Sequence, residues 1–256
     1  MLELRQIESF YPEYLRPFKR NILREYLQYK ILASIFGGKH GSMLVFMGGT
    51  AIHIVHGVAR FSEDLDFDDK GMTRDGFHAM AQEVKRNLVL EGFSVEAGVS
   101  FKGAFSADIK ITNLLFESGL SGHKEEKILI KIDAQPQDFS YKPERIVINK
   151  FDVFCGIVVV PAAILLSQKF YAILNRKRAM GRDFFDAAFL AGLVKPDFRY
   201  LKAKAGIADK ESLKSALLVR CGRLDFKQLA KDAEPFVFVP RDAKKIETFS
   251  EWVKGM

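Results

Sequence analysis

Residues 45–67 of the chain read VFMGGTAIHIVHGVARFSEDLDF. The apolar start predicts a buried strand that ends at Gly48 and Gly49, followed by a helix that begins near Thr50. After a turn at about Gly57, the pattern DLDF predicts a second strand. Two glycines at a strand-to-helix junction let backbone amides approach a ligand closely, and the start of a helix favours negative charge. We therefore expect Gly48, Gly49 and Thr50 to bind phosphate.

The second predicted strand carries two carboxylates. Because side chains alternate between the faces of a strand, Asp64 and Asp66 point one way while Leu65 and Phe67 point into the core. Two carboxylates on one face repel each other unless a cation lies between them, and Mg²⁺ prefers oxygen ligands of this kind. The pair predicts a divalent metal ion, Mg²⁺ with Mn²⁺ as a substitute.

These motifs resemble a known fold and a known family. A glycine pair at a strand end, a short helix and an acidic pair in the next strand resemble the nucleotidyltransferase fold of the polymerase-β superfamily. The longer string GGTA...RFSEDLDF is similar to the nucleotidyltransferase-like toxins of the AbiEii/AbiGii family, found in bacterial abortive-infection and toxin–antitoxin systems. The resemblance is weaker at LIKIDAQ and at QKFYAILNRKRAMGRDFFDAAFL, and it touches most of residues 46–190.

The resemblance implies an α+β fold and a reaction. The fold has a mixed sheet flanked by helices, with residues 1–160 as the catalytic domain and residues 161–256 as a basic, mainly helical domain that completes the site. The reaction is Mg-dependent transfer of a nucleoside monophosphate from an NTP to an acceptor hydroxyl. Some relatives modify the acceptor end of tRNA and so stop translation, and a neighbouring antitoxin is the expected partner.

Two residues immediately before the acidic strand are candidates for the nucleotide site. Arg60 is suited to pair with phosphate oxygens, and Ser62 is suited to donate to phosphate or to the carboxylates. The family resemblance favours both, with Ser62 the better match. By contrast, His53 and His56 lie three residues apart on a helix without a carboxylate at ligand spacing, which disfavours a metal site there.

A third acid is expected on a later strand. Ile128, Ile130 and Ile132 alternate in sequence and face one way, which places Asp133 on the opposite face. By resemblance Asp133 completes the catalytic triad, either as the general base for the acceptor hydroxyl or as an additional metal ligand. A surface aspartate on an edge strand is the alternative.

Basic residues follow on a helix that Pro161 is suited to begin. Lys169 and Arg176 are seven residues apart and share a helical face. By resemblance Lys169 is a site lysine, which would neutralise the triphosphate or the leaving pyrophosphate. The choice among Arg176, Arg178 and Arg182 for a phosphate contact stays open.

Asp183 is a secondary candidate for the nucleotide site. Arg182 and Asp183 match an Arg-Asp pair of the family. With Asp186, however, Asp183 also fits an acidic first turn of a helix that begins after an interruption at Gly181, which requires no catalysis.

Other periodicities predict further regular elements. The expected helices cover residues 17–37, 73–90, 161–176, 183–193, 210–219 and 226–233. The expected strands lie within residues 93–101, 105–116, 124–134 and 145–160, and a polar turn is expected at residues 68–71.

Composition limits the class of protein. With 256 residues, 48% hydrophobic and 28% charged, the chain is typical of an ordinary globular protein. The charged start argues against a signal peptide, and the apolar run at residues 154–166 is too short and interrupted to span a membrane. Only Cys155 and Cys221 are present, so we expect reduced thiols in the cytoplasm and no cysteine-based metal site.

Charge is unevenly distributed along the chain. Residues 1–150 contain 20 Lys and Arg and 20 Asp and Glu, whereas residues 151–256 contain 19 and 12. A basic half suits a polyanionic substrate such as RNA, although a solvated basic surface accounts for it equally well. Two other functions stay open: nucleotidyl transfer to a small molecule or a protein, and binding of a nucleotide or a partner without turnover.

Overall fold

The computed structural model describes residues 1–256 and divides into two compact units. The sheet unit comprises Met1–Val55, Ser62–Asp138 and Pro143–Val160. The helical unit comprises His56–Phe61, Phe139–Lys142 and Pro161–Met256. Two short segments of the first 160 residues therefore belong to the helical unit, because they pair and pack with its helices rather than with the sheet.

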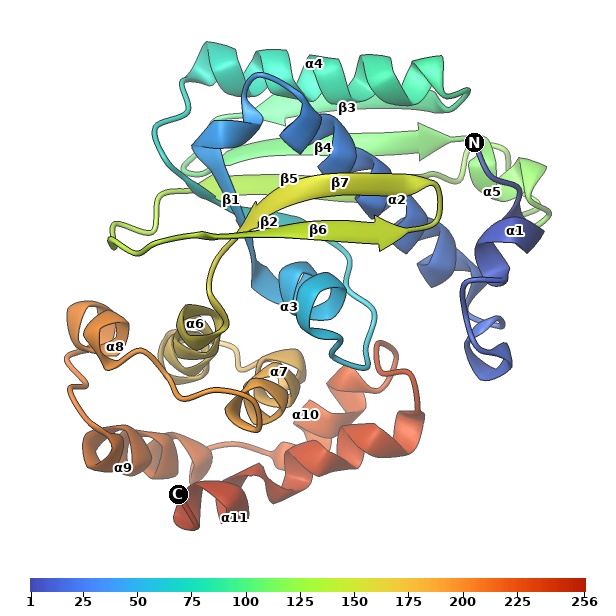
Figure 1. Cartoon of the computed structure of the whole chain (residues 1–256). Helices are drawn as coiled ribbons and strands as arrows, with labels where there is room; N and C mark the ends of the chain where they lie inside the picture. The colour runs from blue at the N-terminus through green and yellow to red at the C-terminus, as the bar shows by residue number, and fades with distance from the viewer. The chain divides into compact units, whose positions relative to one another are not determined.

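The sheet unit contains one mixed seven-stranded sheet in the order β3-β4-β5-β2-β1-β7-β6 (Figure 1). Strand β2 runs parallel to β5 and β1 runs parallel to β7, while the other neighbours are antiparallel. The strands are β1 (Leu44–Met47), β2 (Leu65–Asp69), β3 (Ser94–Ser100), β4 (Phe105–Thr112), β5 (Ile128–Gln135), β6 (Glu144–Lys150) and β7 (Val153–Val159). The expected mixed α/β architecture is confirmed.

Helices pack on this sheet through apolar faces. Helix α2 contacts β7 and β5, helix α4 contacts β3 and β4, and the two helices contact each other. On β1 and β2 the cross-strand partners Phe46 and Phe67 are fully buried, with ring centroids 5.5 Å apart. The helices and 3₁₀ turns of this unit are α1 (Leu4–Glu8), η1 (Glu13–Leu15), α2 (Lys19–Gly37), η2 (Gly41–Met43), α3 (Gly48–His56), α4 (Arg74–Leu90) and α5 (Leu114–Glu117).

Several boundaries follow from local sequence. The Thr73 side chain caps α4 by accepting from the Gly76 amide, which confirms the expected helix start. The strand expected to reach residue 116 ends at Thr112, because Asn113 adopts φ +64° and α5 begins at the next residue. The polar turn expected at residues 68–71 is wrong in its first half, since Asp68 and Asp69 continue β2 and are buried.

Hydrogen bonds explain why these two acids are buried. Asp68 accepts from the Gln137 amide at 2.9 Å and pairs with Lys70 at 2.6 Å. Asp69 accepts from the amides of Gly71 and Met72, which closes the turn out of β2. Both carboxylates are thus supplied with donors, as buried polar groups require.

The helical unit is built from short helices around aromatic residues. Phe184 is fully buried and makes edge contacts with Phe226 and Phe249, whose ring centroids lie 5.5 and 5.0 Å away. The elements are α6 (Ala162–Asn175), α7 (Gly181–Ala191), α8 (Phe198–Ala205), α9 (Lys210–Cys221), α10 (Phe226–Ala233), η3 (Pro240–Thr248) and α11 (Phe249–Lys254). The helices expected at residues 210–219 and 226–233 are confirmed.

Gly181 is the first residue of α7. The sequence instead predicts that Gly181 interrupts the chain before a helix that begins at residue 183. A Cβ atom at this position would lie 2.9 Å from the carbonyl carbon of Leu229 on α10. The glycine therefore lets α7 and α10 approach closely, and Asp183 lies inside α7 instead of capping it. No helix of the structure combines the length and apolar character needed to cross a membrane.

Candidate functional site

Gly48 links the end of β1 to α3 and adopts φ +78°, a conformation that favours glycine. The helix begins at Gly48 itself, whereas the sequence predicts a start near Thr50. A Cβ atom at Gly48 would lie 2.9 Å from both Cβ and Cγ of Asp66, with Oδ2 nearer still. The glycine therefore brings the carboxylate of Asp66 against the first turn of α3, where amides lack acceptors within the helix.

The register of the sheet places two of the predicted acids side by side. Asp66 on β2 is the direct partner of Asp133 on β5 in the parallel pairing. Both side chains are half-buried and project from the same face, while Leu65 and Ile132 are buried on the other. Asp64 lies one residue before β2 and is exposed. The edge-strand alternative for Asp133 is excluded, because β5 lies between β4 and β2.

A lysine already lies among these carboxylates. The ammonium of Lys131 is 3.0 Å from Asp133 Oδ2. Its hydrogen bond to Asp133, reinforced by the negative charges of Asp133, Asp64 and Asp108, raises the pKa of Lys131 above its usual value. The acids thus create a negative potential that attracts a cation, and the lysine partly neutralises it.

The donor set fits a hard divalent ion without forming a complete cage. No three acidic, histidine or cysteine side chains are arranged to hold a metal ion. Mg²⁺, however, is commonly bound by one or two carboxylates together with substrate phosphates and water. Asp66 and Asp133 offer oxygen ligands of this type side by side on one face of the sheet.

Two predicted nucleotide-binding residues have structural contacts. Thr50 is fully buried, and its hydroxyl donates to the Asp64 carbonyl, which ties α3 to the start of β2. Gln28 on α2 donates to the carbonyls of Ser62 and Glu63 at 3.0 and 2.9 Å. The segment before the acids is therefore held from two sides. The Thr50 hydroxyl thus has an acceptor within the chain, and only the backbone amide of Thr50 stays a candidate for phosphate binding.

Lys169 lies within a buried ion cluster of the helical unit. Its ammonium is 2.9 Å from Asp183 Oδ1 and 2.9 Å from Asp186 Oδ2. Burial would lower the pKa of Lys169, but the two carboxylates outweigh it and raise the pKa above its usual value. The structure brings the predicted residues Lys169 and Asp183 together on neighbouring helices, α6 and α7.

Arg60 belongs to the same cluster. Its Nε and one terminal nitrogen each donate to Asp186 at 2.6 Å, and the other terminal nitrogen donates to the Phe61 carbonyl at 2.9 Å. Arg60 is only 2% exposed and Asp186 is fully buried. The guanidinium is thus held by a carboxylate of its own chain, a position unlike the phosphate-facing one that the sequence predicts.

The three candidate arginines have different surroundings. Arg176 Nε lies 3.5 Å from Asp183 Oδ2. Arg178 is exposed and lies 3.8 Å from Asp232, and the guanidinium of Arg182 lies 4.1 Å from the ring centroid of Phe236. Arg176 therefore pairs with an acid that also contacts Lys169.

Sequence reasoning missed three residues that hold these parts in place. In sequence, Asp186 fits one acid of a helix first turn, whereas in the structure it is the buried partner of both Arg60 and Lys169. Gln28 and Glu25 lie within the buried run of α2. Polar residues inside an apolar run are the signal that points to them, because a buried polar group requires a partner.

Glu25 forms a second buried charge cluster, within the sheet unit. It accepts from His53 on α3 at 2.9 Å and pairs with Lys150 at 2.6 Å. Burial would raise the pKa of Glu25, but His53 and Lys150 outweigh it and lower the pKa to about 2. His53 thus has a structural partner.

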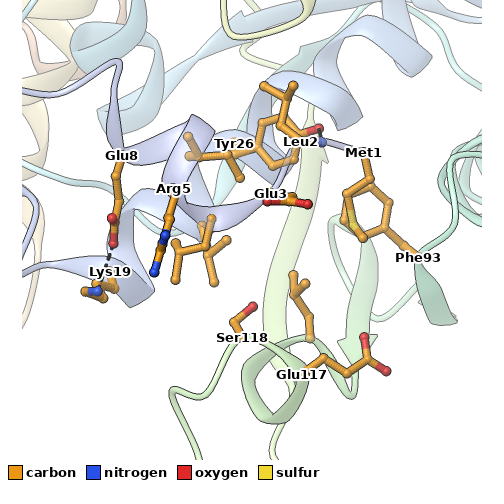
Figure 2. A pocket seen from close by; sticks show the side chains of 14 residues that line it. Met1, Leu2, Glu3, Arg5, Glu8, Lys19, Tyr26, Phe93, Glu117 and Ser118 are labelled. Carbon is orange, nitrogen blue, oxygen red and sulfur yellow. Dashed lines mark hydrogen bonds and ion pairs between the residues drawn. The ribbon is translucent and has the colours of Figure 1, made fainter.

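A hollow of ≈ 460 Å³ in the sheet unit is lined in part by the N-terminal segment (Figure 2). Lys19 and Glu8 form an ion pair of 3.0 Å at its side, and the Tyr26 hydroxyl accepts from the Leu2 amide at 3.0 Å. None of its lining residues comes from β1, α3 or β2. It therefore includes no predicted site residue.

Comparisons with known proteins find one matching family and solved structures of similar fold. The model of the family described as "Nucleotidyl transferase AbiEii toxin, Type IV TA system" matches residues 30–248. The crystal structure of JHP933 from Helicobacter pylori is similar with a TM-score of 0.55 and 17% identity over 92% of each chain. A putative nucleotidyltransferase from H. pylori has a TM-score of 0.55 and 16% identity over 91% of this chain and 94% of its own. No curated protein matches.

Proposed function

This chain belongs to the AbiEii nucleotidyl transferase toxin family of type IV toxin–antitoxin systems, and from this premise we propose that it transfers a nucleoside monophosphate from an NTP to an acceptor hydroxyl with the help of Mg²⁺. The observation that carries the proposal is the position of Asp66. It lies against the glycine turn on one side and opposite Asp133 on the other. The glycine turn and the paired carboxylates thus lie at one place in the sheet unit, which supports the proposal.

Each group of residues has a proposed role. The amides of Gly48, Gly49 and Thr50 bind the phosphates of the NTP. Asp64 and Asp66 would hold the metal ion, with Asp133 as a further ligand or as the general base. The bound ion supplies positive charge to the phosphate oxygens. Ser62 is proposed to donate to phosphate from the segment that Gln28 fixes.

The reaction is a displacement at the α-phosphorus. The acceptor hydroxyl gives its proton to a base, for which Asp133 is the candidate, and its oxygen forms a bond to the α-phosphorus. The bond between the α-phosphorus and the bridging oxygen to the β-phosphate breaks, and pyrophosphate leaves with that electron pair. We retain Lys169, Arg176 and Asp183 as proposed nucleotide-binding residues, and we assign Arg60 to the support of Asp186.

RNA, with tRNA as the first candidate, is the proposed acceptor. The helical unit holds 21 Lys and Arg against 11 Asp and Glu, whereas the sheet unit holds 18 against 21. The positive charge is therefore concentrated in the helical unit, which suits a polyanion. Transfer to a small molecule or a protein is the competing proposal, and it requires no salt-sensitive binding of RNA.

A labelling experiment tests the proposal. The protein is incubated with each labelled NTP, Mg²⁺ and total RNA that includes tRNA, and label is followed on RNA, protein and small molecules. We expect label on tRNA that is lost with Asp66→Asn and kept with Asp75→Asn, a matched change at an exposed site on α4. Nucleotide binding without label on any acceptor would contradict transfer and favour a binding module.

The family also implies a biological partner. A type IV toxin–antitoxin family implies an antitoxin counterpart and an NTP substrate. If toxicity arises from transfer, expression of the chain arrests growth, and Asp64→Ala relieves the arrest at equal protein level. Arrest that persists with Asp64→Ala would separate toxicity from the proposed chemistry.

A further inference from the structure

A hollow of ≈ 510 Å³ lies in the helical unit, among the end of α7 and the starts of α8 and α9, and beside α11. This volume lies within the usual range for ligand pockets, about 300–1,000 Å³. Its walls are apolar and aromatic, with Phe170, Phe198 and Trp252 as the rings. Lys195 and Lys210 also line it, and both are exposed. No predicted catalytic residue contributes to it.

Trp252 is held rigidly in this wall. Its indole stacks on the fully buried ring of Phe170, with centroids 6.5 Å apart and an angle of 14° between the planes. Phe249 contacts it from within α11 at 5.2 Å. The indole nevertheless remains 37% exposed. It therefore offers an aromatic surface whose orientation is fixed before any ligand arrives, which reduces the entropy lost on binding.

The charges around the hollow favour an anionic ligand. Lys195 and Lys210 belong to the unit that carries the excess of basic residues. Glu251, which adjoins Trp252 in sequence, pairs with Lys254 at 2.7 Å. Lys214 donates to the Met256 carbonyl at 3.2 Å, beside the same hollow. Positive charge next to an aromatic surface is the pattern by which proteins bind unpaired nucleotides.

We propose that this hollow binds an unpaired base of single-stranded RNA, with the base stacked against Trp252 and the flanking phosphates on Lys195 and Lys210. The inference rests on the proposed function, because it gives the acceptor RNA a binding place in the helical unit. Stacking requires no particular base, since every base has an aromatic face. The subsite thus holds the strand and leaves the sequence preference to other contacts.

The experiment uses the only tryptophan of the chain as its reporter. Intrinsic fluorescence is measured during titration of the full chain with single-stranded oligoadenylate, with a double-stranded RNA, with single-stranded DNA of the same sequence, and with heparin. We expect single-stranded RNA to quench Trp252 strongly. Heparin, which has charge but no bases, should quench little. Equal quenching by DNA would show that the subsite reads base and phosphate without the 2′-hydroxyl.

Charge-reversal substitutions at the rim of the hollow distinguish RNA binding at this site from nonspecific electrostatic binding. Lys195→Glu and Lys210→Glu should each weaken RNA binding by about tenfold. Each should also lower the slope of log affinity against log salt concentration by about one, the amount expected for one phosphate contact. Lys227→Glu, an equal change of charge at an exposed position on α10, should leave the quenching curve almost unchanged. Trp252→Phe should keep most of the binding, measured by fluorescence anisotropy of labelled RNA, because the smaller ring still stacks.

Three results of the binding measurements would overturn the subsite: no quenching by single-stranded RNA, equal quenching by heparin, or equal weakening by Lys227→Glu and Lys195→Glu. The proposed function fails in a different way. If Trp252 is quenched normally while no label reaches RNA, the subsite stands and the acceptor proposal falls. If label reaches RNA with unchanged KM in both rim variants, transfer stands and the subsite falls.

Discussion

The carboxylate of Asp66 occupies the space that a side chain at Gly48 would need. A Cβ atom at residue 48 would come within 2.9 Å of Asp66 Cβ and Cγ, and the backbone there has φ +78°. Two requirements, close approach and a left-handed backbone, therefore meet at one glycine. This relationship couples the proposed phosphate turn to a proposed metal ligand.

Gly48→Ala is expected to abolish most transfer activity. The new methyl group strains the backbone by about 1–2 kcal/mol and displaces Asp66 as well. A displacement of about 1 Å in such a site costs about 100-fold in kcat/KM. Gly57→Ala is the matched control, because Gly57 also has φ +78° but nothing within 4 Å of an added Cβ. Equal loss of activity in both variants would show that backbone strain alone is responsible.

Arg60→Ala is expected to destabilise the protein by about 3–5 kcal/mol, since it leaves the buried carboxylate of Asp186 without its bidentate partner. Urea unfolding measures the change. Arg199→Ala removes an arginine–aspartate pair whose arginine side chain is 78% exposed, and it should leave the urea midpoint almost unchanged. If Arg60→Ala kept full stability and raised the KM for NTP, the result would support the phosphate role that the sequence predicts.

Stability should fall in acid partly through Glu25. Its pKa is about 2 in the folded protein against an ordinary value of 4.5. The ionised carboxylate therefore stabilises the fold fully above pH 4.5, and this contribution is lost as the pH falls from about 4.5 to about 2. Urea midpoints of the parent and of Glu25→Gln, measured across this range, should converge toward low pH. Parallel curves would rule out Glu25 as a source of the acid sensitivity.

Lys131→Met should strengthen metal binding. The lysine pairs with Asp133 at 3.0 Å and so competes with a cation for that carboxylate. An exposed pair of this kind is worth about 0.2–1 kcal/mol, so half-saturation by Mn²⁺ should move to a concentration lower by about 1.4-fold to fivefold. Calorimetry without nucleotide measures this. Lys127→Met removes a lysine paired with Glu96 and should not change Mn²⁺ binding. Equal affinities in all three proteins would remove Asp133 from the proposed ligand set.

Local patterns predicted much of the sheet unit. Alternating side chains in DLDF and in the isoleucine run around residue 130 predicted the faces of β2 and β5, because strand geometry fixes a period of two. The glycine pair after an apolar strand predicted the turn into α3, and Thr73 predicted the start of α4. Pairing between strands distant in sequence gave no local signal. The neighbours Asp66 and Asp133 became evident only from the parallel register of β2 and β5.

The sequence by itself determined the glycine turn and the alternation of the acids, because both depend on backbone conformations set by adjacent residues. Only the tertiary structure decided the partners of the charged residues. Arg60 and Asp186 are 126 positions apart, so no local sequence pattern predicts that they pair. The physical reason is burial: a charge removed from water must find an opposite charge, and which one it finds depends on how the helices and strands pack.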